Sequence, residues 1–202
     1  MDSKDYLKDI SEIKHLMNKS SRFISLSGLS GIMAGVYALI GAAVAYYLVM
    51  HFSYGTLMLD GQIFRWVLLD LILVALLSIV TGIILTTKKA KKNGSKVWDA
   101  TSRRLVINFL IPLVVGGLYI LIILNQQKYG QVGALMLIFY GLALINASKY
   151  SIGDIRYLGL TEIVLGLIAA LLPGYGFWLW VLGFGIMHIV YGTWMYFKYD
   201  SN

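Results

Sequence analysis

The chain has 202 residues, of which 58% are hydrophobic and 13% charged, with 17 Lys and Arg against 10 Asp and Glu and no cysteine. A soluble domain carries about 25% charged residues, so this composition argues against a soluble enzyme and against a disordered chain. The lack of cysteine excludes a disulfide scaffold and a thiolate zinc site. We therefore interpret the chain as an integral membrane protein.

Residues 1–22 predict a cytoplasmic amphipathic helix. Apolar residues recur at helical spacing from Tyr6 to Met17, while lysines alternate with acidic residues on the opposite side. Asp2 and Ser3 can cap the start of this helix. We expect it to lie on the inner leaflet or against the bundle. The alternative is a helix that docks a cytoplasmic protein partner.

Six continuous apolar stretches follow, each close to the roughly 20 residues that a spanning helix needs. Their unbroken hydrophobicity argues against a β-barrel, whose strands alternate in polarity. The fifth stretch is the shortest and contains a glutamate. The predicted fold is an all-α integral membrane protein, residues 23–202, with spans at about 23–50, 64–87, 105–125, 131–148, 155–172 and 176–197.

Basic residues fall almost entirely on one side of these spans. Of the 17 Lys and Arg, only Arg65 and Lys128 lie on the other side. The positive-inside rule then places both termini and the basic loop 88–104 in the cytoplasm. The same residues can contact anionic lipid headgroups, which accounts for the net charge of +7 without a nucleic-acid partner.

Short motifs recur between the spans and predict an internal repeat. In the odd spans, Gly35 with the residues after it corresponds to Gly117 and to Gly166. We expect three in–out–in hairpins related by an axis along the membrane normal. The even spans share Ile79–Gly82, Ile138–Gly141 and Ile189–Gly192, each followed by a lysine.

Small residues form a seam along the first span. Gly28, Gly31 and Gly35 lie on one side of the expected helix. Such residues let helix backbones approach closely in lipid. We expect this seam to pack within the monomer, and the alternative is a homodimer through the first span.

The last hairpin carries Tyr157–Leu160, Gly166–Ile168, Pro173–Gly174 and Ile189–Gly192. With its proline at the outer turn and its glycine late in the second helix, it resembles the hairpin repeat of the HdeD-like small membrane proteins. The resemblance implies six spans in three hairpins, and one member of that family is linked to acid resistance. The whole chain also resembles small inner-membrane proteins of Gram-negative bacteria. Neither resemblance supplies an activity or a functional residue.

Three ionisable residues fall inside the predicted spans: Asp70, Glu162 and His188. Each costs about 2.5–3.5 kcal/mol at a helix centre, so each calls for an explanation. Glu162 and His188 would sit about 9 and 15 Å from the cytoplasmic end of one hairpin, so they can meet. We expect an inward-facing polar cluster that either holds helices together or binds a proton or ligand. Its other expected members are Thr81, Asn108, Asn146 and Tyr191.

Asp70 lies near the outer end of the second span, with Arg65 as its expected partner. A structural role is one interpretation. The alternative is an acidic residue in an outward-facing vestibule on a proton or cation path.

The sequence carries no motif for catalysis. His15, His51 and His188 are widely separated, and no phosphate-binding glycine loop is present. We therefore expect no enzyme activity, cofactor or metal. The first expectation is a bacterial inner-membrane scaffold or stress-response protein that meets a partner through its cytoplasmic helix and basic loop. The alternative is a transporter or channel for a proton, cation or small molecule, which a water-accessible cavity reaching Glu162 would favour.

Overall fold

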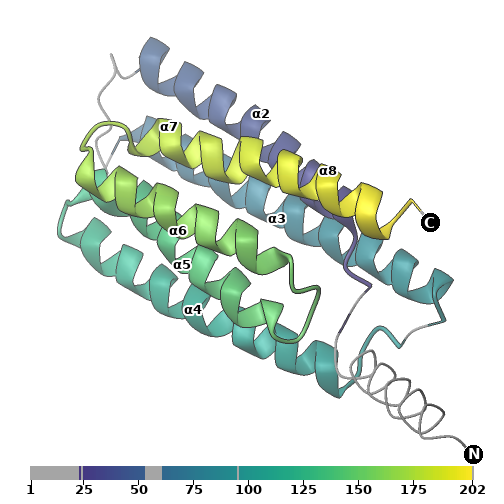
Figure 1. Cartoon of the computed structure of the whole chain (residues 1–202). Coiled ribbons are helices and arrows are strands. Elements are labelled where there is room, and N and C mark those ends of the chain that lie inside the picture. The colour runs from purple at the N-terminus through teal and green to yellow at the C-terminus, as the bar shows by residue number, and fades with distance from the viewer. Residues whose placement is uncertain (1–22, 24, 53–60, 95, 202) are drawn as a thin grey trace, which may run out of the picture.

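The computed structural model describes residues 23, 25–52, 61–94 and 96–201. These residues form an all-α bundle of long, roughly aligned helices (Figure 1). The amphipathic helix expected within residues 1–22 lies outside the described residues. The helices are α2 (Gly28–Phe52), α3 (Gln62–Lys92), α4 (Ala100–Asn125), α5 (Val132–Ser148) after the short turn η1 (Tyr129–Gln131), α6 (Ile155–Leu171), α7 (Gly176–Trp180), the π-helical segment η2 (Val181–Met187) and α8 (His188–Tyr199).

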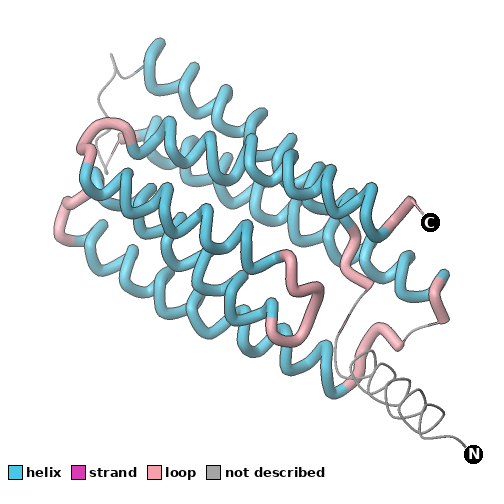
Figure 2. The backbone as a smooth tube through the Cα atoms, in the orientation of Figure 1, coloured by secondary structure: helices cyan, strands magenta, loops and turns pink. Residues whose placement is uncertain are grey.

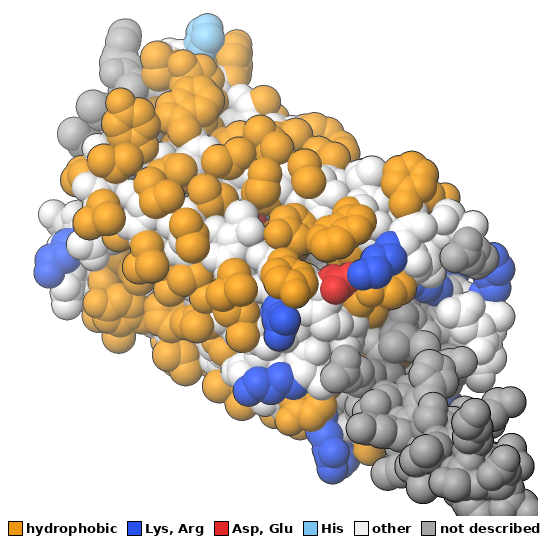
Figure 3. All heavy atoms as spheres, in the orientation of Figure 1, with side chains coloured by type: hydrophobic (Ala, Val, Ile, Leu, Met, Phe, Trp, Pro, Cys, Tyr) orange, Lys and Arg blue, Asp and Glu red, His pale blue; other side chains and the backbone are white. Residues whose placement is uncertain are grey.

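Within the described residues, five helices are long and apolar enough to cross a membrane, and this confirms a multi-pass integral membrane protein that contacts lipid. They are α2, α3, α4, the run Tyr129–Ser148, and the run Gly176–Tyr199 that joins α7, η2 and α8. The remaining helix, α6, has 17 residues and ends shortly before Pro173, which cannot continue a helix. Hydrophobic side chains cover most of the flank of the bundle in view, as Figure 3 shows.

The loop expected at 88–104 is shorter in the structure, because helices occupy both of its ends. α3 continues to Lys92, and α4 begins after Asp99. The Asp99 carboxylate accepts the Ser102 backbone N–H at 2.7 Å, while the Ser102 hydroxyl accepts the Asp99 N–H at 2.8 Å. This reciprocal cap fixes the start of α4. The backbone donor of Ser102 also holds the pKa of Asp99 below its usual range.

The helices pack in two groups of three, as Figures 1 and 2 allow the reader to follow. In one group α2 lies between α3 and the α7–η2–α8 rod, and in the other α5 lies between α4 and α6. The groups meet where α7 and η2 contact α5 and α6.

Glycines set the close crossing of α2 with the rod. A Cβ added at Gly28 would lie 2.7 Å from the Gly192 carbonyl oxygen, and one at Gly35 would lie 2.6 Å from the Gly185 carbonyl oxygen. Both distances are too short for a side chain, so the helices touch through their backbones. Gly31 lies in the same contact, where an added Cβ would be 3.1 Å from the Gly192 Cα. The small-residue seam of the first span is therefore filled within the chain.

A second crossing, between α5 and α6, has the same register. A Cβ at Gly159 would lie 2.7 Å from the Gly141 carbonyl oxygen, and one at Gly166 would lie 2.9 Å from the Ala134 carbonyl oxygen. The contacting positions are again seven residues apart on each helix. By contrast, a Cβ at Gly82 of α3 or at Gly117 of α4 would meet no described atom within 4 Å.

Asp200 ties one end of the bundle together. Its carboxylate accepts the Gly28 N–H at 2.9 Å and the Ser27 hydroxyl at 3.1 Å, and it also pairs with the Lys89 ammonium group. The N-terminal end of α2 is thereby held to the C-terminal ends of α3 and α8. Nearby, the Phe23 N–H donates to the Tyr150 carbonyl oxygen at 2.8 Å.

Candidate functional site

Glu162 lies on the buried face of α6. The helix buries residues at positions 155, 158, 159, 162, 165, 166 and 169, which is the spacing of one helical face. Glu162 occupies the middle of this otherwise apolar stripe and is 0% exposed. Neither carboxylate oxygen has a hydrogen-bond partner among the described residues. A buried carboxylate without partners is costly, which makes it the first candidate for a functional role.

His188 is the nearest ionisable neighbour of Glu162. It is the first residue of α8 and is 5% exposed. Its Nδ1 atom lies 3.4 Å from the Glu162 Oε1 atom and 3.0 Å from the Gly183 carbonyl oxygen. The structure thus brings together the glutamate and the histidine that were expected to meet across the last hairpin.

Tyr140 of α5 completes the group from a third helix. Its hydroxyl lies 2.8 Å from the His188 Nε2 atom, and its ring stacks on the imidazole with centroids 5.3 Å apart. No sequence pattern predicted this tyrosine as a member of the site, although it stands in the repeated motif Ile138–Gly141. Its position there, one residue before the crossing glycine, is the signal that could have found it.

The π-helical segment makes room for the buried carboxylate. A Cβ added at Gly183 would collide with the Glu162 Oε2 atom and would lie 3.2 Å from its Cδ atom. The wide π turn also presents the Gly183 carbonyl oxygen to His188. Single π turns within α-helices are frequent at functional sites.

The three side chains lie in one row, with Glu162 3.4 Å from His188 and His188 2.8 Å from the Tyr140 hydroxyl. A neutral imidazole donates from one nitrogen and accepts at the other. With the proton on Nδ1, His188 donates to the Gly183 carbonyl oxygen and faces Glu162, while Nε2 accepts the Tyr140 hydroxyl. This assignment of the proton follows from the partners, because the carbonyl oxygen can only accept. The arrangement can hold a proton on either Glu162 or His188.

None of the other polar residues expected in the cluster forms a hydrogen bond with Glu162 or His188 in the described part of the chain. Thr81 of α3 lies 3.2 Å from the Tyr37 hydroxyl of α2. Asn108 donates to the Arg104 carbonyl oxygen of its own helix at 2.8 Å. Tyr191 lies 3.4 Å from the Thr161 hydroxyl, and Asn146 is half-buried on α5.

Asp70 is separate from this group and lines a groove between α2 and α3. Among the described residues, no ion pair joins it to Arg65 or to another basic side chain. Nor does the described part of the chain contain three His, Asp or Glu residues grouped as a metal site would need.

Comparisons with protein-family models, with curated proteins and with solved structures found no match for this chain. The resemblance to the HdeD-like proteins therefore stays a prediction.

Proposed function

We propose that this protein is a small membrane transporter or channel in which Glu162, with His188 and Tyr140, takes up and releases a proton. The groove that the structure describes lies between α2 and α3 and is not lined by Glu162, so the support for this proposal is not a cavity. It is the fully enclosed Glu162 carboxylate, neither of whose oxygens has a hydrogen-bond partner among the described residues. A group that only joined helices would be expected to satisfy both oxygens. Intramembrane ionisable groups commonly mark proton relays and ion pathways.

The energetics of the pair support reversible proton binding. A bare carboxylate in this enclosure lacks solvation, so a proton must lie on Glu162 itself or on His188, 3.4 Å away. With the proton on Glu162 both side chains are neutral. With the proton on His188 the carboxylate and the imidazolium compensate each other's charge. Because Nδ1 already carries a proton toward the Gly183 carbonyl oxygen, His188 can accept a further proton only at Nε2, beside the Tyr140 hydroxyl.

We propose further that the chain crosses the bacterial inner membrane six times with both termini in the cytoplasm. The ion pair of Lys198 with Asp154, at 2.6 Å, and the tie of Lys89 to Asp200 gather basic residues from separate helices at one end. Among the Lys and Arg of the described residues, only Arg65, at the start of α3, and Lys128, in the turn after α4, lie at the opposite end. This distribution agrees with the positive-inside rule when α6 is counted as a span.

The two glycine crossings support the proposed hairpin repeat. Gly192 and Gly185 meet α2 in the same register in which Gly141 and Ala134 meet α6. Each crossing joins an even span to an odd span of a different hairpin. The matching third pair would be α3 with α4, but these helices form no such crossing in the described residues, where a Cβ at Gly82 or Gly117 would meet no atom within 4 Å and Gly116 packs on Phe139 of α5.

Proton flux into liposomes tests the proposed function. The purified protein is reconstituted with a pH-sensitive dye inside, and a pH step is applied with valinomycin and potassium to balance charge. We expect flux above that of empty liposomes and its loss in Glu162→Gln, which keeps the shape and removes the ionisable group. Asp99→Asn is the matched control, because asparagine also caps a helix. Equal flux in Glu162→Gln and in the unchanged protein would overturn the proposal.

The scaffold role is a second candidate, favoured by the exposed lysines at the end of α3. Lys88, Lys91, Lys92 and Lys96 are all exposed and can meet an acidic partner or anionic lipid. A deletion strain challenged at low pH separates the two roles. A scaffold predicts rescue by Glu162→Gln but not by the variant with all four lysines changed to glutamine. A transporter predicts the reverse.

A further inference from the structure

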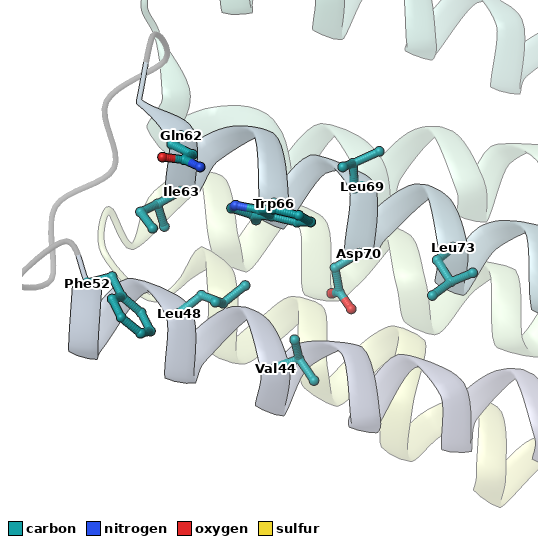
Figure 4. A pocket seen from close by; sticks show the side chains of 9 residues that line it. All are labelled: Val44, Leu48, Phe52, Gln62, Ile63, Trp66, Leu69, Asp70 and Leu73. Atoms are coloured by element: carbon teal, nitrogen blue, oxygen red, sulfur yellow. The ribbon is translucent and has the colours of Figure 1, made fainter.

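A groove of about 530 Å³ runs between the outer halves of α2 and α3, away from the Glu162 group. Figure 4 shows Ile63 and Asp70 of α3 extending toward α2, with Leu48 of α2 between the two helices. Its volume falls within the usual range for small-molecule sites, roughly 300–1,000 Å³. The groove is lined by Val44, Leu48 and Phe52 of α2 and by Gln62, Ile63, Trp66, Leu69, Asp70 and Leu73 of α3.

One carboxylate stands in this apolar groove. Asp70 points from α3 toward α2 (Figure 4), and it is half-buried. Neither Lys nor Arg is among the residues that line the groove, and no described basic side chain pairs with Asp70. The carboxylate is thus left without a countercharge in apolar surroundings, where attraction to a cation is stronger than in water.

The backbone of α2 leaves space for this carboxylate. A Cβ added at Gly41 would lie 3.1 Å from the Asp70 Oδ2 atom and would also collide with Val74. Any larger residue at this position would push Asp70 from its place. Trp66 precedes Asp70 by one helical turn, so its ring and the carboxylate share one face of α3.

We propose that this groove binds a monovalent organic cation with an apolar body. The aliphatic walls would take the body of the ligand, Asp70 its charge, and the Trp66 ring would add attraction to a delocalised cation. A lipid acyl chain would fit the walls but would give the carboxylate no partner. The identification of this cation as a transported substrate rests on the proposed function. The binding of the cation to the groove does not.

Equilibrium dialysis of the full chain in nanodiscs tests the binding. The probes are tetraphenylphosphonium and tetraphenylborate, which have nearly the same size and opposite charge, with empty nanodiscs measuring their partition into lipid. We expect saturable binding of the cation only. Asp70→Asn should weaken it about tenfold or more, since tenfold corresponds to 1.4 kcal/mol. Asp99→Asn is the matched control, because it removes an acidic charge away from the groove.

Two further variants make the result decisive. Leu48→Trp keeps Asp70 and fills the groove, so it should also weaken cation binding. Glu162→Gln should leave cation binding unchanged even when it stops proton flux, which separates this inference from the proposed function. Equal binding of both probes, or unchanged cation binding in an Asp70→Asn protein with an unaltered thermal unfolding curve, would overturn the proposal.

Discussion

The glycine crossing of α5 with α6 allows a quantitative test of the packing. An alanine Cβ at position 159 would lie 2.7 Å from the Gly141 carbonyl oxygen, whereas ordinary contact begins at 3.4 Å. The helices must therefore separate by about 0.7 Å at this point. A gap of roughly 0.5–1 Å forfeits a quarter to a half of each van der Waals contact along the seam. We expect Gly159→Ala to lower the free energy of unfolding by about 1–3 kcal/mol, the usual cost of overpacking.

Gly117→Ala is the matched control on α4, where an added Cβ meets no described atom within 4 Å. Alanine also favours the helix by about 1 kcal/mol over glycine in water, so this variant should be neutral or slightly more stable. Both unfolding free energies can be measured by titrating micelles with sodium dodecyl sulfate and following tryptophan fluorescence and circular dichroism together. If the two variants unfold alike, the close crossing of α5 with α6 does not carry the stability we assign to it.

Three more predictions concern single polar contacts. Asp99→Ala should cost about 1 kcal/mol at neutral pH through loss of the α4 cap. Because folding lowers the pKa of Asp99, its stabilisation exists above the unfolded value of about 3.9 and is lost as pH falls through the folded value. The stabilities of wild type and variant, measured against pH, should therefore converge in strong acid. Asp200→Ala should speed hydrogen exchange at the Gly28 amide, measured by mass spectrometry, because it removes the acceptor of that amide. An unchanged exchange rate would show that Asp200 does not protect this amide. Tyr140→Phe keeps the ring but removes the hydroxyl next to His188, so liposome proton flux should fall without loss of folding, and full flux would remove Tyr140 from the path.

Hydrophobicity was enough to predict the helices but not all of their ends. The spans predicted at 64–87 and 105–125 are α3 and α4, which run further, to Lys92 and from Ala100. The extra turns are polar, so an apolar window stops short of them. At the start of α4, the reciprocal cap of Asp99 and Ser102 decides the boundary, and this local signal is independent of hydrophobicity.

The contacts of the candidate site could be predicted only between segments that are adjacent along the chain. Glu162 and His188 lie on adjacent segments, so helical rise alone indicates that they can meet. Tyr140 comes from a helix whose place depends on the Gly141–Gly159 crossing, and no spacing within one helix reveals that contact. Asn108 illustrates the opposite case, because its amide is satisfied by the backbone of its own helix.

The hydrogen bond from the Gly28 N–H to Asp200 joins residues 172 positions apart. An amide at the start of the first described helix can therefore meet this partner only after residue 200 has been synthesised. Until then the backbone N–H groups at the start of α2 must donate to water, to lipid headgroups or to a chaperone. The contact between the start of α2 and Asp200 is therefore a late step in biogenesis. Its timing depends on the order in which the chain is made rather than on the strength of one contact.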